Sequence, residues 1–168
     1  MQPPPGLAGF CEANKDRLVG VLTLHCGDQG IAEELAQETL ARVCTHWRSV
    51  GRMTNPEAWM FRVGINVSNS YFRRKLAERK ARERLGTDLS HHDPDLSDAV
   101  AVRQAVGSLP KRQRSVLVLR YFADLSVHDV AETLDMPEGT VKTLTRRGLK
   151  SLRQSMSPND LQEVPNVG

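Results

Sequence analysis

The sequence predicts an all-α protein of two small helical domains joined by a flexible linker, with a helix-turn-helix in the C-terminal domain. Apolar residues recur at three- and four-residue intervals through most of the chain, as in amphipathic helices, and no segment alternates with the period of a β-strand. This pattern breaks in residues 86–98, which are rich in Asp, His and Ser. The 168 residues suffice for two small domains, because domains of roughly 50–200 residues are typical.

Three helices are expected in the first domain, residues 1–85. The first runs from Leu7 to Cys26 and ends at Gly27-Asp28. The second has acidic and amide side chains on one face and an apolar stripe on another, formed by Ala32, Leu35, Ala36, Thr39, Leu40, Val43 and Trp47. The third begins at Asn55-Pro56-Glu57, because Asn caps a helix, Pro fits its first position and Glu suits the positive end of the dipole.

The third helix carries Trp59, expected in the core, and then merges into a basic block. The block consists of Arg73, Arg74, Lys75, Arg79, Lys80, Arg82 and Arg84. A second basic block lies near the C-terminus, and the segment between them, residues 85–102, has aspartates and no lysine or arginine. Such clustering indicates a binding surface for an anion or nucleic acid, although a solvated charged face remains the alternative.

The second domain, residues 99–156, restarts with a short helix containing Val102, Val106 and Leu109. Pro110 opens another helix from Lys111 to about Phe122, and Ser126-Val127-His128-Asp129 matches a capping box that starts a third. Asp135-Met136 is the expected turn, and Pro137 begins the last helix. Residues 157–168 are expected to be a disordered tail.

Composition narrows the class of protein. The three cysteines, Cys11, Cys26 and Cys44, have no CxxC spacing, so we expect neither a disulfide framework nor a metal site, and reduced thiols fit the cytoplasm. No stretch approaches the roughly 20 apolar residues of a membrane span, and the N-terminus lacks a secretory signal. No nucleophile–base pair, phosphate loop or cofactor motif indicates an enzyme; the weak exception is His91-His92 with nearby aspartates in the linker.

The segment from Ser126 to Arg153 has the properties of a major-groove reader. Two short helices meet at a tight turn, and the second presents basic and hydroxyl side chains away from its apolar stripe: Lys142, Thr143, Arg146, Arg147 and Lys150. Arginine suits guanine edges, whereas lysine and threonine serve phosphates. Thr140, near the helix N-terminus, is a phosphate candidate.

Five segments in order resemble one protein family. They are AEELAQET at 32–39, NPEAW at 55–59, LPKRQR at 109–114, VLVLRYF at 116–122 and PEGTVK at 137–142. Together they resemble the extracytoplasmic-function (ECF) sigma factors of bacterial RNA polymerase. Within that family the chain resembles the actinobacterial sigma-E-like subgroup, because it has a tryptophan, Trp47, near the end of the second helix. The resemblance covers nearly the whole chain.

The resemblance implies a division of labour between the two halves. Residues 7–84 would bind the clamp of core RNA polymerase and melt the −10 element, while residues 99–156 would bind the −35 element and the polymerase flap. On the second helix, the polymerase contacts would be Glu34, Leu35, Gln37 and Glu38, although an ordinary solvated acidic face is the alternative for the polar ones. The −10 contacts would be Arg52 in a capture loop at 48–54, Asn66 beside it, and Arg73, Arg74 and Lys75 along the phosphates. Family behaviour also implies an anti-sigma partner.

Some positions depart from the family pattern. Ser70 stands where many relatives carry an aspartate, so a carboxylate contact with Arg73 is not expected. Asp135 replaces a turn glycine, which is tolerable because aspartate visits left-handed geometry. Gly148 should weaken the last helix by about 1 kcal/mol relative to alanine. A stand-alone helix-turn-helix regulator, whose N-terminal half only dimerises or senses a ligand, is the alternative function.

Overall fold

A computed structural model describes residues 4–86 and 98–156, and every regular element in those ranges is helical. The all-α prediction is confirmed. The N-terminal half contains α1 (Leu7–Cys26), α2 (Gln29–Val50) and α3 (Pro56–Arg84). The C-terminal half contains α4 (Asp98–Ser108), α5 (Lys111–Leu117), the π-helical turn η1 (Val118–Phe122), α6 (Val127–Leu134) and α7 (Glu138–Ser155). Most of the expected linker, the expected tail and the His91-His92 pair lie outside the described residues.

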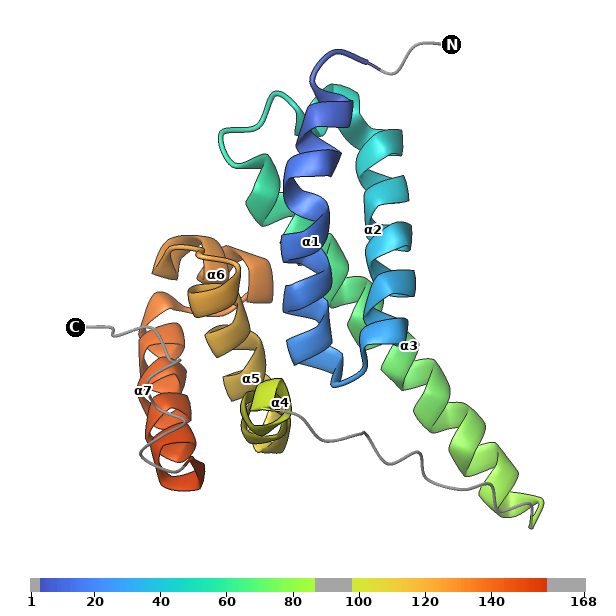
Figure 1. The fold of residues 1–168 in the computed structure, drawn as a ribbon, viewed down its shortest axis with the longest axis vertical. Helices are drawn as coiled ribbons and strands as arrows, with labels where there is room; N and C mark the ends of the chain where they lie inside the picture. The colour runs from blue at the N-terminus through green and yellow to red at the C-terminus, as the bar shows by residue number, and fades with distance from the viewer. Residues whose placement is uncertain (1–3, 87–97, 157–168) are drawn as a thin grey trace.

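Helices α1 and α2 lie side by side and antiparallel, with α3 crossing behind them (Figure 1). The chain reverses between α1 and α2 because Gly27 adopts a left-handed conformation at φ 80° and the Asp28 carboxylate then accepts from the Ile31 N–H at 2.8 Å. Apolar side chains of the three helices meet in a common core, which includes Leu18, Leu22, Val43, Phe61 and Ile65.

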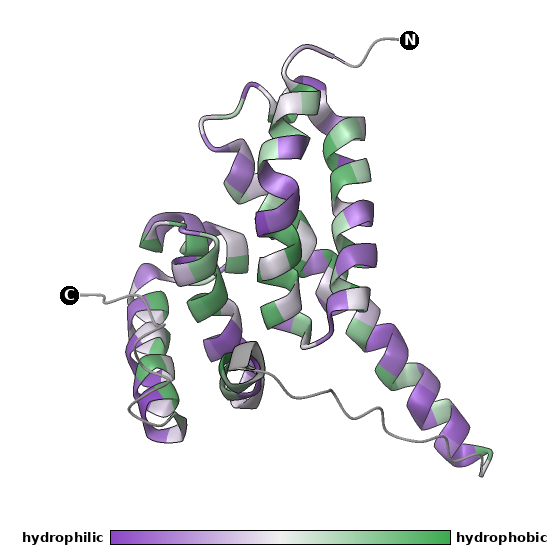
Figure 2. Ribbon diagram, in the orientation of Figure 1, coloured by the Kyte–Doolittle hydropathy of each residue, from purple (hydrophilic) through white to green (hydrophobic). Residues whose placement is uncertain are grey.

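Helix α3 begins where its sequence signals placed it. The Asn55 side chain accepts from the Ala58 N–H at 3.0 Å, and Pro56 occupies the first turn. Buried residues end at Ser68, and every residue from Phe72 to Arg84 is exposed. The basic second half of α3 therefore extends beyond the bundle as a hydrophilic arm (Figures 1 and 2).

In the C-terminal half, the helix predicted from Lys111 to Phe122 is not uniform. It is α-helical to Leu117 and then widens into η1, where the Ala123 N–H donates to the Val118 carbonyl five residues back at 3.0 Å. Leu119, within this wide turn, and Ala123, directly after it, are both buried. Periodicity cannot distinguish such a turn from the last turn of an α-helix.

The two halves contact each other in this structure, α1 against η1 and α4, and α3 against α6. Two arginines bridge them in opposite directions. Arg17 of α1 pairs with Glu57 at 3.1 Å and donates to the Ala123 carbonyl in the other half. Arg114 of α5 donates to the His25 carbonyl of α1 at 3.0 Å.

Gly148 has a role that composition did not indicate. It is buried where α7 crosses α5, and a Cβ there would lie 2.8 Å from Leu117 Cδ1 and 3.1 Å from its Cγ. The expected propensity penalty of glycine is thus offset by the close approach of two helices that a larger residue would push apart.

None of the described helices has both the length and the apolar character needed to cross a bilayer.

Candidate nucleic-acid and polymerase interfaces

The helix-turn-helix is built from local signals. The Ser126 hydroxyl accepts from the Asp129 N–H at 3.0 Å and donates to the Asp129 carboxylate at 2.7 Å, which fixes the start of α6. Asp135 ends α6 in a left-handed conformation at φ 51°, as its tolerance of that geometry predicted. His128 lies 3.6 Å from Glu132 on α6 and 3.2 Å from Glu138 at the start of α7, so it joins the two helices.

Helix α7 has a buried and an exposed side. Val141, Gly148 and Leu152 are buried. The predicted −35 residues lie away from them: Lys142, Arg146, Arg147 and Lys150 are exposed, and Thr140 and Thr143 are half-buried. None of the ion pairs found among the described residues involves these four cations. The exposed side of α7 can therefore meet an anionic surface without first breaking an internal pair.

A hollow at the N-terminal end of α7 adds one residue that the sequence reasoning missed. It is lined by Gly139, Thr140, Thr143, Leu144 and Arg147 together with Arg112 of α5. Arg112 is exposed and brings a guanidinium next to the α7 N-terminus, where backbone N–H groups already favour an anion. Its place could not be deduced from sequence, because it depends on how α5 crosses α7.

Along α3 the predicted −10 residues are all exposed, but they do not share one face. Asn66 and Arg73 are seven residues apart, so they lie within about 20° of each other around the helix, whereas Lys75 lies about 180° from Asn66. Arg73 donates to the Ser70 hydroxyl at 3.0 Å. Lys75 lies 5.6 Å from the Tyr71 ring centroid. Arg52 is exposed in the loop before α3.

The candidate polymerase surface on α2 needs one correction. Glu34, Gln37 and Glu38 are exposed, but Leu35 is 3% exposed and belongs to the core. Leu35 was expected to anchor a partner. It lies instead on the same buried stripe as Ala32, Ala36 and Thr39, where it packs in the core and is not accessible to a partner. Glu38 pairs with Arg42 at 2.6 Å.

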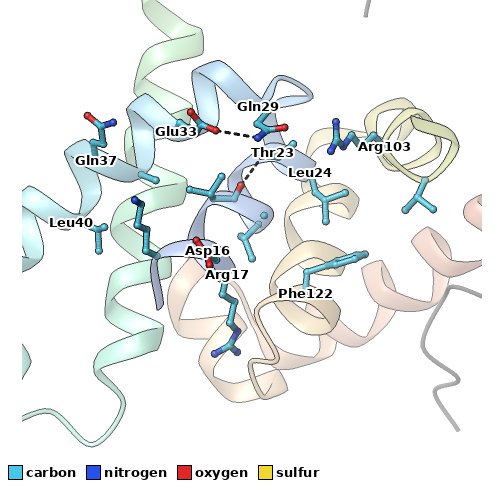
Figure 3. A pocket seen from close by; sticks show the side chains of 16 residues that line it. Asp16, Arg17, Thr23, Leu24, Gln29, Glu33, Gln37, Leu40, Arg103 and Phe122 are labelled. Atoms are coloured by element: carbon cyan, nitrogen blue, oxygen red, sulfur yellow. Dashed lines mark hydrogen bonds between the residues drawn. The ribbon is translucent and has the colours of Figure 1, made fainter. Parts of the chain in front are cut away.

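Beside this surface lies an open groove of about 850 Å³ between the two halves (Figure 3). Its floor is α1, with Thr23 and Leu24; one wall is α2, with Glu33, Gln37 and Leu40; Arg103 and Phe122 lie on the opposite side. Gln29 donates to Glu33 at 3.1 Å on the α2 wall. The groove combines apolar side chains with a charged and amide rim.

His25 lies at the contact between the two halves and has a strongly shifted pKa. It is 3% exposed, its Nδ1 has no hydrogen-bond partner, and it faces Asn69 of α3 and Arg114 and Lys111 of α5. Burial, reinforced by the Arg114 charge, lowers the pKa of His25 to about 4. His25 is thus neutral at neutral pH. Among the described residues, no cluster of three or more His, Cys, Asp or Glu side chains is arranged to hold a metal ion.

Two family models match the chain, one in each half. The model described as Sigma-70 region 2 matches residues 10–78, and Sigma-70, region 4 matches residues 105–154. The first range contains α2 and most of α3, and the second contains the whole helix-turn-helix.

The proteins that this chain resembles in sequence are sigma factors. The RNA polymerase sigma-E factor of Streptomyces antibioticus is 31% identical over 131 residues, covering 77% of this chain and 73% of that protein. The ECF RNA polymerase sigma factor SigW of Bacillus subtilis is 27% identical over 164 residues, covering 89% of this chain and 88% of SigW. None of these matches supports the alternative of a stand-alone regulator.

Solved structures share the fold. The sigma factor RpoE of Bartonella quintana, solved in complex with the anti-sigma factor NepR, superposes with a TM-score of 0.72 at 20% identity, covering 88% of this chain and 94% of that one. CnrH, solved with the cytosolic domain of CnrY, gives 0.61 at 18% identity, covering 88% and 85%. At these identities the likeness concerns the fold alone. The region 2 and region 4 matches and the 31% identical relative show the family: this chain belongs to the ECF sigma factors, the alternative sigma factors that direct RNA polymerase to promoters.

Proposed function

We propose that the chain catalyses no reaction itself and acts in the cytoplasm by joining core RNA polymerase and contacting promoter DNA at two elements. Residues 1–85 would bind the polymerase clamp and melt the −10 element, and residues 99–156 would bind the −35 element and the flap, with 86–98 as the linker. The observation that carries this proposal is the exposed cationic side of α7, presented by a capped helix-turn-helix in a chain that also has an exposed basic arm on α3.

At the −35 element, Arg146 and Arg147 read base edges while Lys142 and Lys150 neutralise phosphates. Thr140, Thr143 and the newly recognised Arg112 surround the hollow at the α7 N-terminus, which suits a backbone phosphate. Arg146 and Arg147 lie on different sides of Thr143 around the helix, so the two arginines are expected to read different base pairs.

Substitutions on α7 test these roles. Arg147→Ala should cost roughly 1–3 kcal/mol of promoter affinity and relax the base preference at one position. Lys150→Ala should weaken all sequences alike and lower the salt dependence of binding. Both variants are compared by holoenzyme binding to a matched series of −35 sequences across salt concentrations. An Arg147→Ala variant with unchanged promoter selectivity contradicts the base-reading role.

At the −10 element, the capture of unstacked bases falls to the loop that holds Arg52 and to the face of α3 shared by Asn66 and Arg73. Arg74 and Lys75 serve phosphates farther along the arm, with Lys75 on its other side. Asn66→Ala should impair open-complex formation more than −35 binding, measured by permanganate reactivity and by duplex binding of the same holoenzyme. Equal losses in both measurements would reject this assignment. Arg62→Ala, exposed one turn earlier on α3, is the matched control.

The polymerase-binding surface is formed by Glu34, Gln37 and Glu38, which complement a basic partner, while Leu35 holds α2 in place from the core. An anti-sigma partner would lie in the groove beside this surface and cover Gln37, so that it competes with core polymerase. Hydrogen exchange of the complex checks this: protection should extend over 29–40 and the Thr23–Leu24 floor. Protection confined to α7 would contradict the groove as its site.

A further inference from the structure

The antiparallel pair α1–α2 has a fixed register near the N-terminus. The rings of Phe10 and Trp47 pack with centroids 5.1 Å apart, and the Trp47 indole N–H donates to the Pro5 carbonyl at 3.0 Å. These two contacts tie the first turns of α1 to the last turns of α2. Figure 1 shows these two ends of the helices next to each other.

This register brings Cys11 of α1 against Cys44 of α2. Cys11 follows Phe10, and Cys44 precedes Trp47 by nearly one helical turn, so both belong to the facing sides. The Cys44 side chain is near enough to Cys11 to contribute, after burial, to the raised pKa of the Cys11 thiol. Cys11 is half-buried and Cys44 is exposed, and both are free thiols.

The third cysteine is remote from this pair. Cys26 is at the opposite end of α1, fifteen residues from Cys11 and hence about 22 Å along the helix axis. Its thiol donates to the Leu22 carbonyl at 2.7 Å, and burial raises its pKa. A reaction that joins two cysteines within the folded chain can therefore reach only Cys11 and Cys44.

We propose that Cys11 and Cys44 form a redox-sensitive dithiol that a low-molecular-weight disulfide converts to an intramolecular disulfide stapling α1 to α2. The exposed Cys44 thiolate attacks one sulfur of the small disulfide and releases its first thiolate. The Cys11 thiolate then attacks the Cys44 sulfur and releases the second. The protons of the two protein thiols end on the two small thiols, so the cysteines are oxidised and the small disulfide is reduced.

The order of the two attacks follows from their surroundings. Cys44 meets the oxidant first because it is the exposed partner. Burial, together with the neighbouring Cys44 side chain, raises the pKa of Cys11, so its thiolate is scarce and Cys11 attacks second, after the mixed disulfide has placed an electrophilic sulfur beside it. The staple would close the chain between residues 11 and 44 and hold the first turns of α1 on α2 next to Trp47 and the capture loop.

The test uses the full-length reduced protein and oxidised glutathione at neutral pH. The expected product is a monomer with one free thiol instead of three, lighter by two hydrogen atoms, and with a peptide that links Cys11 to Cys44. Its apparent Tm should exceed that of the reduced protein and return on reduction. A stable glutathione adduct on Cys44 with Cys11 still free, or Cys44-linked dimers as the main product, would overturn the proposal.

Variants separate the pair from the third cysteine. Cys26→Ser should close as the wild type does, whereas Cys44→Ser and Cys11→Ser should neither lose two hydrogens nor gain stability on oxidation. The same oxidation in concentrated guanidinium chloride should lose its preference for Cys11–Cys44 over pairs that include Cys26. An unchanged preference in denaturant would mean that the fold does not select this pair, and the proposal would fail.

Discussion

Acid should destabilise this protein through His25, which lies buried where the two halves meet. Its ring has no partner for Nδ1 and faces the charges of Arg114 and Lys111, with Asn69 as a polar neighbour. In the unfolded chain the pKa of His25 is the ordinary 6.5, and in the folded protein it is about 4. The folded state therefore disfavours a proton that the unfolded state accepts, and stability falls as pH decreases below about 6.5.

The size of the effect follows from the difference between these two pKa values. Each unit of pKa difference is worth about 1.4 kcal/mol, so the loss approaches a ceiling of roughly 3–4 kcal/mol once pH falls below 4. At pH 5 the unfolded histidine is protonated and the folded one mostly is not, so about 2 kcal/mol of unfolding free energy should already be lost. That is a large share of the stability of a small domain.

Urea unfolding of wild type and His25→Gln between pH 7.5 and 5 measures this contribution. His25→Gln removes the titration, so its unfolding free energy should decline less steeply with falling pH. The difference between the His25→Gln and wild-type slopes isolates His25 from carboxylates that also titrate. If His25→Gln retained the wild-type slope, burial of a neutral imidazole would not be the source of acid sensitivity.

Two further predictions concern helix packing and capping. Gly148→Ala should lower the unfolding free energy by about 1 kcal/mol, because overlap with Leu117 exceeds the gain in helix propensity; Gly20→Ala on α1, where nothing lies within 4 Å, should instead raise it. Equal stabilisation of both variants in thermal melts would disprove the close α5–α7 approach. Ser126→Ala should cost about 1 kcal/mol through loss of the α6 cap, whereas Ser126→Asp should keep most of it. Chemical denaturation measures both variants, and a Ser126→Ala protein as stable as the wild type would contradict the role of Ser126 as a cap.

The parts of the fold that the sequence predicted correctly depend on local chemistry. Asn55 and Ser126 cap helices through contacts within three residues, and Gly27 and Asp135 end them through their own backbone geometry. Such signals need no knowledge of the tertiary structure. The same is true of the exposed cations of α7, whose side of the helix follows from the apolar stripe alone.

The features that the sequence could not predict depend on contacts between distant segments. Leu35 is an exception, because its own apolar stripe already predicted a place in the core and the assignment to a partner surface was wrong. Arg112 joins the α7 hollow only because α5 crosses α7, and the same crossing makes Gly148 a packing residue. Arg17 and Arg114 bind carbonyls more than 80 residues away, a pairing that no local pattern records.

Reconstituted transcription tests the central claim most directly. Core RNA polymerase with the full-length chain is presented with a library of promoters randomised over both elements, and the transcripts are sequenced. We expect initiation that requires the chain and selects two separate sequence blocks, one of which changes when Arg147 is replaced and the other of which is lost with Asn66→Ala. Selective binding of duplex DNA by the chain alone, with no initiation on adding core enzyme, would contradict the account.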